Sequence, residues 1–215
     1  EEKMKKFILI LLLVVVAIIG ILASLLLPVL GKARQSARKT VCISQHKQIG
    51  IALSAYPDDN DEYLPGALRY GSNAQYRIGS DKLSERLASY MGKPASHPSD
   101  YVNNKSFLCP SFSGTVSGVS EGKAIQSRTA GSYDDNGSNR RYFGYPDQYD
   151  SSTINKVIDP DASIALFETD NLYEPGKAGG DLSVEIRHGY KGSGAVRVKL
   201  YFDAHVDAKV DPIEL

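Results

Sequence analysis

The stretch "FILILLLVVVAIIGILASLLLPVLGKAR", residues 7–34, decides the fold of this chain. No charged residue occurs between positions 7 and 31, and a basic run then begins at Lys32. This apolar run exceeds the ~20 residues with which a helix crosses the ~30 Å hydrocarbon layer of a bilayer. The sequence therefore predicts a helix that lies in lipid or in an equally dry environment.

A secretory signal peptide is the first alternative, because Lys3, Lys5 and Lys6 precede the apolar run. The apolar region of a signal peptide is usually only about 7–15 residues long and ends in small residues at a cleavage site. Here the run is longer, and "LLLPVL" at its end is a poor cleavage context. An uncleaved segment is favoured, and an ordinary single-pass anchor stays open.

The residues after Gly31, "KARQSARKTVCISQHKQIGIALSAY", predict an amphipathic continuation of the helix. One stripe at steps of three and four contains Cys42, His46, Ile49, Leu53 and Tyr56. Such spacing places side chains on one helical face. We expect one helix from about residue 7 to 56, apolar on all sides in its first half and with one buried face in its second.

The segment from residue 7 to 65 resembles the N-terminal half of a type IV pilin or type II secretion pseudopilin. The resemblance rests on the apolar block, Gly20, Pro28, the basic helix and the ending "YPDDNDEYLP", in that order. Beyond residue 65 it is confined to "FLCPS" (107–111) and "RHGYKGSGAVRVKLYFDAHVD" (187–207). The second of these is similar to a His-to-Asp-Gly element of one large pilin-like group.

The resemblance implies an α+β fold, with a long N-terminal helix packed on a C-terminal antiparallel β-sheet domain with long loops. The expected parts are a leader or retained basic N-terminus (1–6), an apolar transmembrane or filament-core helix (7–31), an amphipathic helix (32–56) and a globular domain (57–215).

The resemblance also implies a structural subunit, without enzymatic activity, that polymerises into a helical filament through its apolar helix. The residues implicated in filament assembly are Phe7, Leu11, Gly20 and Pro28. The implied partners are further copies of the chain, the cytoplasmic membrane before assembly, and a pilus or secretion assembly machinery. The implied location is the cytoplasmic membrane and then an extracellular filament, or a periplasmic one for a pseudopilin.

Three positions depart from that family. Lys6 stands where a Gly normally precedes the cleavage site, and Leu11 stands where a Glu is thought to neutralise a neighbouring subunit's N-terminal amine. The Asp-Gly pair reads Asp203-Ala204. Cleavage before Phe7 is therefore not supported by the resemblance, and a retained leader stays open.

Two other classes of function stay open: a non-polymerising, membrane-anchored binding domain, and a metal-dependent enzyme built around His188. The formal net charge of zero gives no reason to expect nucleic acid as the main partner. The charges are unevenly spread, with a basic cluster at 32–47 and an acidic one at 58–62. They form either solvated surfaces or bands that meet between copies of the chain.

The two cysteines, Cys42 and Cys109, permit a single intrachain pairing. A disulfide is favoured in an oxidising compartment. Two buried thiols are the alternative.

The rest of the chain predicts α+β structure. Residues 80–92 indicate a short helix with Ser80 or Asp81 as N-cap and Gly92 as its stop. Residues 111–161 indicate long irregular loops, whose Tyr133, Tyr142, Phe143, Tyr145 and Tyr149 are either packed or exposed. Four antiparallel strands are expected in "SIALFE", "LSVEIRH", "AVRVKLYF" and "HVDAKV", with Asp203-Ala204 as the last turn.

Candidate metal ligands are few in the sequence. His188, Asp203, His205 and Asp207 carry suitable chemistry, but a polar strand face or hairpin end is the favoured interpretation. "DDNDE" and "DDNGSN" offer oxygens for calcium without the full calcium-loop pattern, and "DPDASIALFETD" is interpreted as a strand. No catalytic residue, metal site or cofactor is therefore assigned, and calcium stays open.

Overall fold

The fold is taken from a computed structural model of the 215-residue chain. It describes residues 1–66, 68, 72–73, 75–93, 97, 99–111, 125–129, 142–143, 151–157, 159–161, 163–168, 188, 190–191 and 194–212. The chain forms two compact units, residues 1–37 and residues 38–215.

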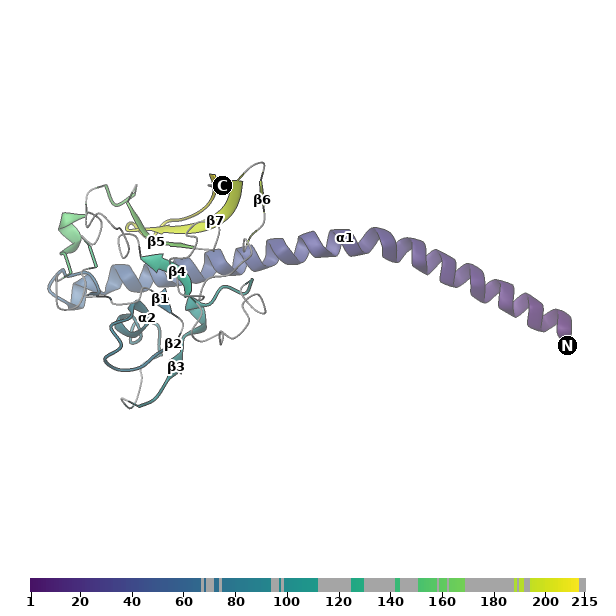
Figure 1. Cartoon of the computed structure of the whole chain (residues 1–215), viewed down its shortest axis with the longest axis horizontal. Helices are drawn as coiled ribbons and strands as arrows, with labels where there is room; N and C mark the ends of the chain where they lie inside the picture. Colours follow the sequence, from purple (N-terminus) through teal and green to yellow (C-terminus); the bar gives the residue numbers. More distant parts are fainter. Residues whose placement is uncertain are drawn as a thin grey trace. The chain divides into compact units, whose positions relative to one another are not determined.

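Helix α1 (Glu2–Ala55) runs without a break through both the apolar and the amphipathic part of the predicted helix (Figure 1). A 3₁₀ turn, η1 (Pro57–Asp59), follows it directly. Pro57 has no N–H to continue the helical hydrogen bonds, which explains why α1 ends here. The predicted long helix is confirmed, with its end one residue before Tyr56.

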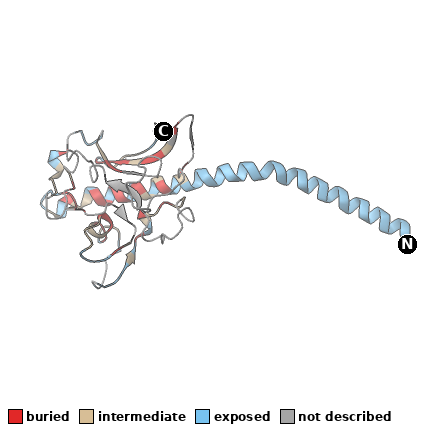
Figure 2. Ribbon diagram, viewed as in Figure 1, coloured by how far each residue is buried: buried red, intermediate tan, exposed pale blue. Residues whose placement is uncertain are grey.

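In the second unit, one face of α1 packs against the sheet, and its buried positions alternate with exposed ones along the ribbon (Figure 2). The buried residues are Cys42, His46, Ile49, Gly50, Ala52 and Leu53. Tyr56 is half-buried and packs at the edge of the same core. The predicted apolar stripe is therefore the face that the domain covers.

A six-stranded antiparallel sheet covers this face, with the path β1-β4-β5-β7-β6 and with β8 paired to β7. Its strands are β1 (Ser72–Asn73), β4 (Ile125–Thr129), β5 (Ile164–Glu168), β6 (Tyr190–Lys191), β7 (Gly194–Tyr201) and β8 (Val206–Pro212). The long β7–β8 hairpin runs in register from the pair Gly194–Pro212 to the pair Leu200–Val206. The α+β arrangement of a long helix with a C-terminal antiparallel sheet is confirmed.

Smaller elements complete the described part of the domain. They are the β2–β3 ribbon (Gln75–Tyr76 and Val102–Asn103), α2 (Leu83–Arg86), η2 (Lys105–Phe107) and η4 (Ile154–Lys156). In η2, the Asn104 side chain accepts a hydrogen bond from the Ser106 N–H and so caps the turn.

The main core lies between α1 and the sheet. Ile49 and Leu53 from the helix meet Leu166 of β5 and Leu200 of β7, and Phe107 also belongs to this cluster. Burial of these side chains is worth roughly 1.5–3 kcal/mol each. The helix is thereby attached to the domain through its second half.

Two predictions need correction. The helix expected over 80–92 is only Leu83–Arg86, and its N-cap is Lys82. Asp81 has a left-handed backbone (φ 51°), and the Glu85 carboxylate accepts hydrogen bonds from Ser80, so neither expected residue caps the helix. Gly92, with φ 63°, ends the turns that follow, as predicted.

The second correction concerns 111–161, where β4 is a strand of the main sheet rather than loop. Its sequence, "IQSRT", has too little apolar alternation to be recognised. Of the expected strands, β5, β7 and β8 are confirmed, and most of "LSVEIRH" lies outside the described residues. Tyr142 and Phe143 pack against Phe202, while Tyr133, Tyr145 and Tyr149 lie outside the described residues.

Candidate functional site

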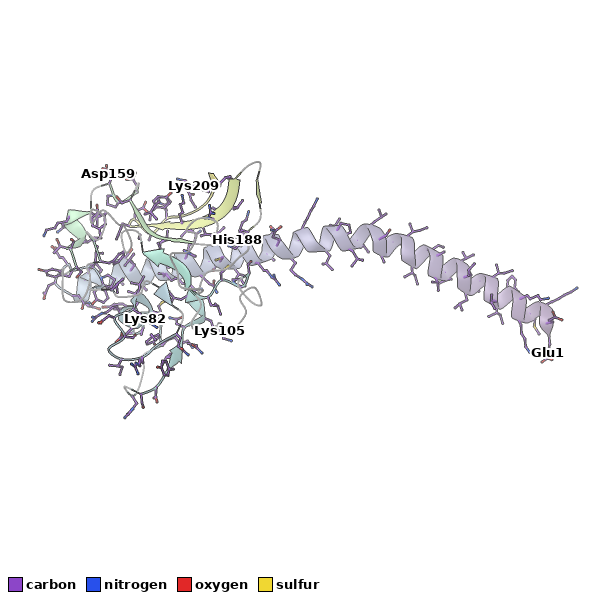
Figure 3. The ribbon with its side chains drawn as sticks, in the orientation of Figure 1. Glu1, Lys82, Lys105, Asp159, His188 and Lys209 are labelled. Atoms are coloured by element: carbon purple, nitrogen blue, oxygen red, sulfur yellow. The ribbon has the colours of Figure 1, made fainter. Side chains whose placement is uncertain are left out.

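The first candidate site is the apolar segment of α1, whose side chains project from the helix on all sides (Figure 3). Phe7 is 68% exposed and Leu11 is 57% exposed. A Cβ added at Gly20 would meet nothing within 4 Å. By length and composition the helix is able to cross a membrane, and none of its most apolar stretch is buried in the structure.

Pro28 lies inside this helix. It has no N–H to donate to the carbonyl of Ser24, four residues earlier. The Ser24 hydroxyl in turn donates to the Ile21 carbonyl at 2.7 Å. The stretch between Gly20 and Pro28 is therefore helical in the single chain but has a weakened ladder of backbone hydrogen bonds.

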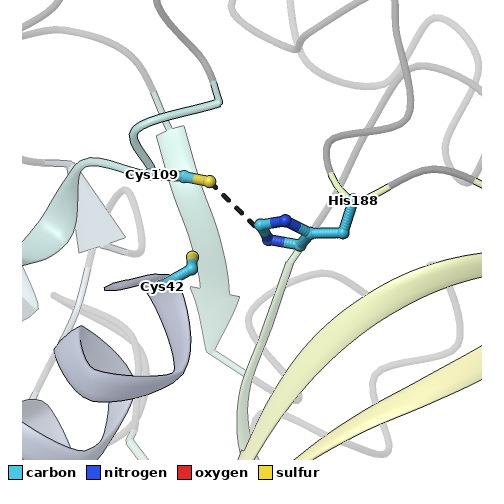
Figure 4. Close-up of side chains that lie close together, drawn as sticks. All are labelled: Cys42, Cys109 and His188. Atoms are coloured by element: carbon cyan, nitrogen blue, oxygen red, sulfur yellow. Dashed lines mark hydrogen bonds between the residues drawn. The ribbon is translucent and has the colours of Figure 1, made fainter. Parts of the chain in front are cut away.

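A second candidate site lies inside the domain, where Cys42, Cys109 and His188 converge (Figure 4). One ligand atom from each residue lies within 4.8 Å of those from the other two. Cys109 Sγ is 3.7 Å from His188 Nε2. The three side chains point toward one another although they come from α1, from the segment after η2 and from the segment before β6.

The surroundings of this cluster are dry. Cys42 and Cys109 are 0% and 1% exposed, and His188 is 6% exposed. The two cysteines pack on Val198 of β7, and the half-buried side chains of Ile43, Leu108 and Val206 adjoin them. Burial among apolar side chains disfavours any charge that is not balanced at the site itself.

A second histidine supports the position of Cys42. His46 is fully buried one helical turn later, and its Nδ1 lies 3.0 Å from the Cys42 carbonyl oxygen and 4.0 Å from Cys42 Sγ. The imidazole therefore fixes the helical turn that carries this sulfur.

The predicted Cys42–Cys109 pair is brought together by the fold but is not bonded in the structure. The disulfide stays a prediction, since a small movement of either side chain changes the distance between the sulfurs. The sequence marked His188 as a candidate metal ligand, but together with Asp203, His205 and Asp207 and not with the cysteines, from the nearer of which, Cys109, it is 79 residues away.

The other candidate ligands form no metal-type group with His188 among the described residues. Asp203 Oδ1 accepts a hydrogen bond from the His205 N–H at 3.0 Å and lies 2.6 Å from His205 Nδ1. His205 stacks on Tyr201, and Asp207 pairs with Lys209. These contacts belong to the end of the β7–β8 hairpin, with Asp203 and Ala204 in its turn as predicted. No metal cluster within the described ranges includes these three residues.

Electrostatics at this turn are local. Partial burial raises the pKa of Asp203, but the hydrogen bonds from the backbone and side chain of His205 outweigh it, and the net effect is a lowered pKa. On the adjacent strand, the Tyr201 hydroxyl and the Asp207 carboxylate raise the pKa of Lys209. Both effects stabilise the charged hairpin end.

The calcium candidates are only partly described. In "DDNDE", Asp59 accepts a hydrogen bond from the Tyr90 hydroxyl and Glu62 accepts one from Asn155. Among the residues with described structure, these carboxylates form no group of three ligands. "DDNGSN" lies outside the described residues, and the "SIALFE" part of the third candidate forms β5.

Comparisons with protein families, with curated proteins and with solved structures find no match to this chain.

Proposed function

We propose that the protein is a pilin-like structural subunit, which resides in a membrane through the apolar part of α1 and polymerises into a helical filament by the same segment. The observation that carries this proposal is an uncharged helical segment of which every side chain is exposed. A single membrane anchor needs such a surface only for lipid. A filament subunit needs it twice, first for lipid and then for the neighbouring copies.

The way in which α1 continues supports the filament role. The same unbroken helix carries the apolar segment and the face on which the domain folds. Helices of neighbouring copies are able to bundle through the first half while each copy keeps its own domain on the second. The apolar residues then replace lipid by one another, at roughly 25 cal/mol for each Å² buried.

In our proposal, charged residues set the register between copies. Lys32, Arg34 and Arg38 are exposed on α1, and Asp58 and Asp61 are exposed just after it. In our proposal the basic band of one copy meets the acidic band of another, which orients the copies rather than supplying most of the affinity.

The decisive experiment is electron microscopy of material sheared from cells that produce the chain, with mass spectrometry to identify it in purified fibres. Helical filaments that contain the chain are the expected result. A photo-crosslinker at Leu11 should give a ladder of multimers in the same cells. The matched control is a crosslinker at Ile78, which is an exposed apolar position of the domain.

The alternative is a membrane-anchored binding domain that does not polymerise. Two sequence features favour it, namely Lys6 and Leu11 in place of the Gly and Glu of typical pilins. Under this alternative the Leu11 crosslinker gives only monomer, and no fibre contains the chain. That outcome would reject the filament role while leaving the membrane role intact.

A further inference from the structure

We propose that Cys42, Cys109 and His188 form a zinc-binding site that links α1 to the domain. The proposal stands on the convergence of two sulfurs and one imidazole nitrogen from three distant segments. It concerns only the unit of residues 38–215, so it does not depend on the filament role.

The geometry is close to that of a loaded site. Zinc binds sulfur at ~2.3 Å and imidazole nitrogen at ~2.0–2.1 Å in a tetrahedral arrangement, which separates neighbouring ligand atoms by roughly 3.5–3.8 Å. The Cys109 Sγ to His188 Nε2 distance of 3.7 Å already lies in this range. All three ligand atoms lie within 4.8 Å of one another, so about 1 Å of side-chain movement closes the site.

Charge balance favours a divalent ion such as Zn²⁺ over Cu⁺, another ion that thiolate ligands prefer. Two thiolates and a neutral imidazole neutralise Zn²⁺, and binding releases the two thiol protons to solvent. The resulting neutral complex suits the apolar surroundings provided by Val198, Ile43 and Leu108. Cu⁺ in the same ligands would leave a net negative charge, which burial disfavours.

The ligand set has a definite coordination chemistry. Two cysteines and one histidine hold zinc in known protein sites and leave a fourth tetrahedral position for water. His46 is not among the three ligands, but its Nδ1 contacts the Cys42 carbonyl at 3.0 Å and so positions the helical turn that presents Cys42. Outer residues that orient ligands typically contribute 10–100-fold to metal affinity.

A bound zinc ion would link α1 to the rest of the domain, which is the role of a Cys42–Cys109 disulfide in the competing interpretation. The disulfide joins α1 to only one of the two other segments, the one that carries Cys109. The zinc ion joins α1 to both other segments. The presence of an imidazole nitrogen at 3.7 Å from the Cys109 sulfur is what favours metal over disulfide.

The test uses the full chain, purified in detergent without oxygen, reductant or chelator. Native mass spectrometry distinguishes the three possible states. One zinc ion adds its mass less that of two protons, a disulfide removes two hydrogens without metal, and dithiol protein has the unmodified mass. We expect one zinc per chain, confirmed by elemental analysis. Disulfide or metal-free dithiol as the main species would overturn the proposal.

Binding is then measured on metal-free protein by competition with a chromophoric zinc chelator, and Co²⁺ serves as a spectroscopic probe of thiolate ligation. Cys42→Ser, Cys109→Ser and His188→Gln should each weaken zinc binding by more than ~100-fold, and His46→Gln by ~10–100-fold. His205→Gln, the same substitution at the hairpin end, should leave the affinity unchanged.

Loss of folding in a ligand variant would not conceal the answer, because the unsubstituted protein supplies a second measurement. Zinc that binds only the folded chain raises the midpoint of thermal unfolding, by an amount that grows with free zinc concentration. Mg²⁺ at the same concentration is the control, since it prefers oxygen ligands. Equal midpoints with and without zinc would overturn the proposal.

Discussion

At the scale of single residues, Gly50 allows the close approach of α1 to the β7–β8 turn. A Cβ at this position would lie 2.8 Å from Leu200 Cδ1 and 3.2 Å from the Ala204 Cβ. Both neighbours are held in place, because Leu200 is fully buried and Ala204 has a left-handed backbone with φ 66°. The helix could not take up its present packing with a larger residue here.

We therefore expect Gly50→Ala to destabilise the domain. Overpacking typically costs 1–3 kcal/mol, and it opposes a gain of about 1 kcal/mol in helix propensity. The net loss is expected to be about 1 kcal/mol, and thermal unfolding of the full chain in detergent measures it. Gly31→Ala is the matched control, since its Cβ meets nothing within 4 Å. A Gly50→Ala protein as stable as the control would contradict this packing.

A second residue-scale prediction concerns pH. Burial raises the pKa of Asp203, but hydrogen bonds from His205 outweigh it and lower the pKa in the folded state. A carboxyl with a lowered folded-state pKa stabilises the fold above its unfolded-state value, near 3.9, and this contribution is lost as the pH falls through the folded value. The carboxyl is 35% exposed, so solvent keeps its contribution below about 1 kcal/mol.

Asp203→Asn should therefore lower the free energy of unfolding at pH 7, by less than about 1 kcal/mol, and flatten the acid limb of the stability curve below about pH 4, where its difference from the unsubstituted chain disappears. Urea unfolding of the full chain across this pH range is the measurement. An exposed carboxyl outside the turn, Asp58, provides the control substitution. An unchanged acid limb in Asp203→Asn would show that the hydrogen bonds from His205 do not stabilise the charged form of Asp203.

At the scale of elements, the sequence predicted those parts whose periodicity is strong. The stripe through Cys42, Ile49 and Leu53 indicated the buried face of α1, and alternation indicated β5, β7 and β8. Weak patterns failed. β4 is stabilised by pairing with β1 and β5 rather than by its own composition, and the left-handed Asp81 prevents the expected start of α2.

The candidate site shows the same limit more sharply. Because the chain has only two cysteines, they permit a single pairing, and this predicted a contact between positions 42 and 109. Nothing local to His188 indicates that it joins them, because the contact brings together three segments that lie far apart in the sequence. The fold decides such long-range contacts. The sequence around these three residues has no periodic pattern that would have predicted this one.

The element-scale prediction concerns the stretch between Gly20 and Pro28. It is helical in the single chain, where lipid would offer no partner for freed backbone groups. In a filament we expect it to become extended, with helix resuming near Gly31. Pro costs ~3 kcal/mol in a helix interior, so this stretch is the first to yield when packing between copies competes with it.

Cryo-electron microscopy of the filament provides the test, with Pro28→Ala as the variant. Restoring the N–H at position 28 should favour the unbroken helix and thereby alter filament rise or extensibility. A simple proline kink in a continuous helix is the competing account. Helical density without interruption through residues 7–56, or a Pro28→Ala filament of unchanged rise and extensibility, would decide for the kink.

At the scale of the whole molecule, the division between residues 37 and 38 separates two kinds of stability. Every side chain of the apolar segment is exposed in the isolated chain. The domain has its own core between the second half of α1 and the sheet, and this core includes Ile49, Leu166 and Leu200. Folding of the domain and association of the apolar segments should therefore be separable.

Deletion of residues 1–31 is expected to give a soluble, folded monomer that forms no filament. The deletion leaves all residues of the domain core in place. It removes the surface whose burial supplies the main association energy in our proposal, at roughly 25 cal/mol per Å². Light scattering and circular dichroism would establish the folded monomer, with the full chain in detergent as the reference for its unfolding midpoint.

Filaments of unchanged helical symmetry from the truncated chain would contradict the assembly role of the apolar segment, because contacts between domains would then suffice. A truncated chain that fails to fold would instead show that the domain depends on the helix preceding Lys32, against the division into two units.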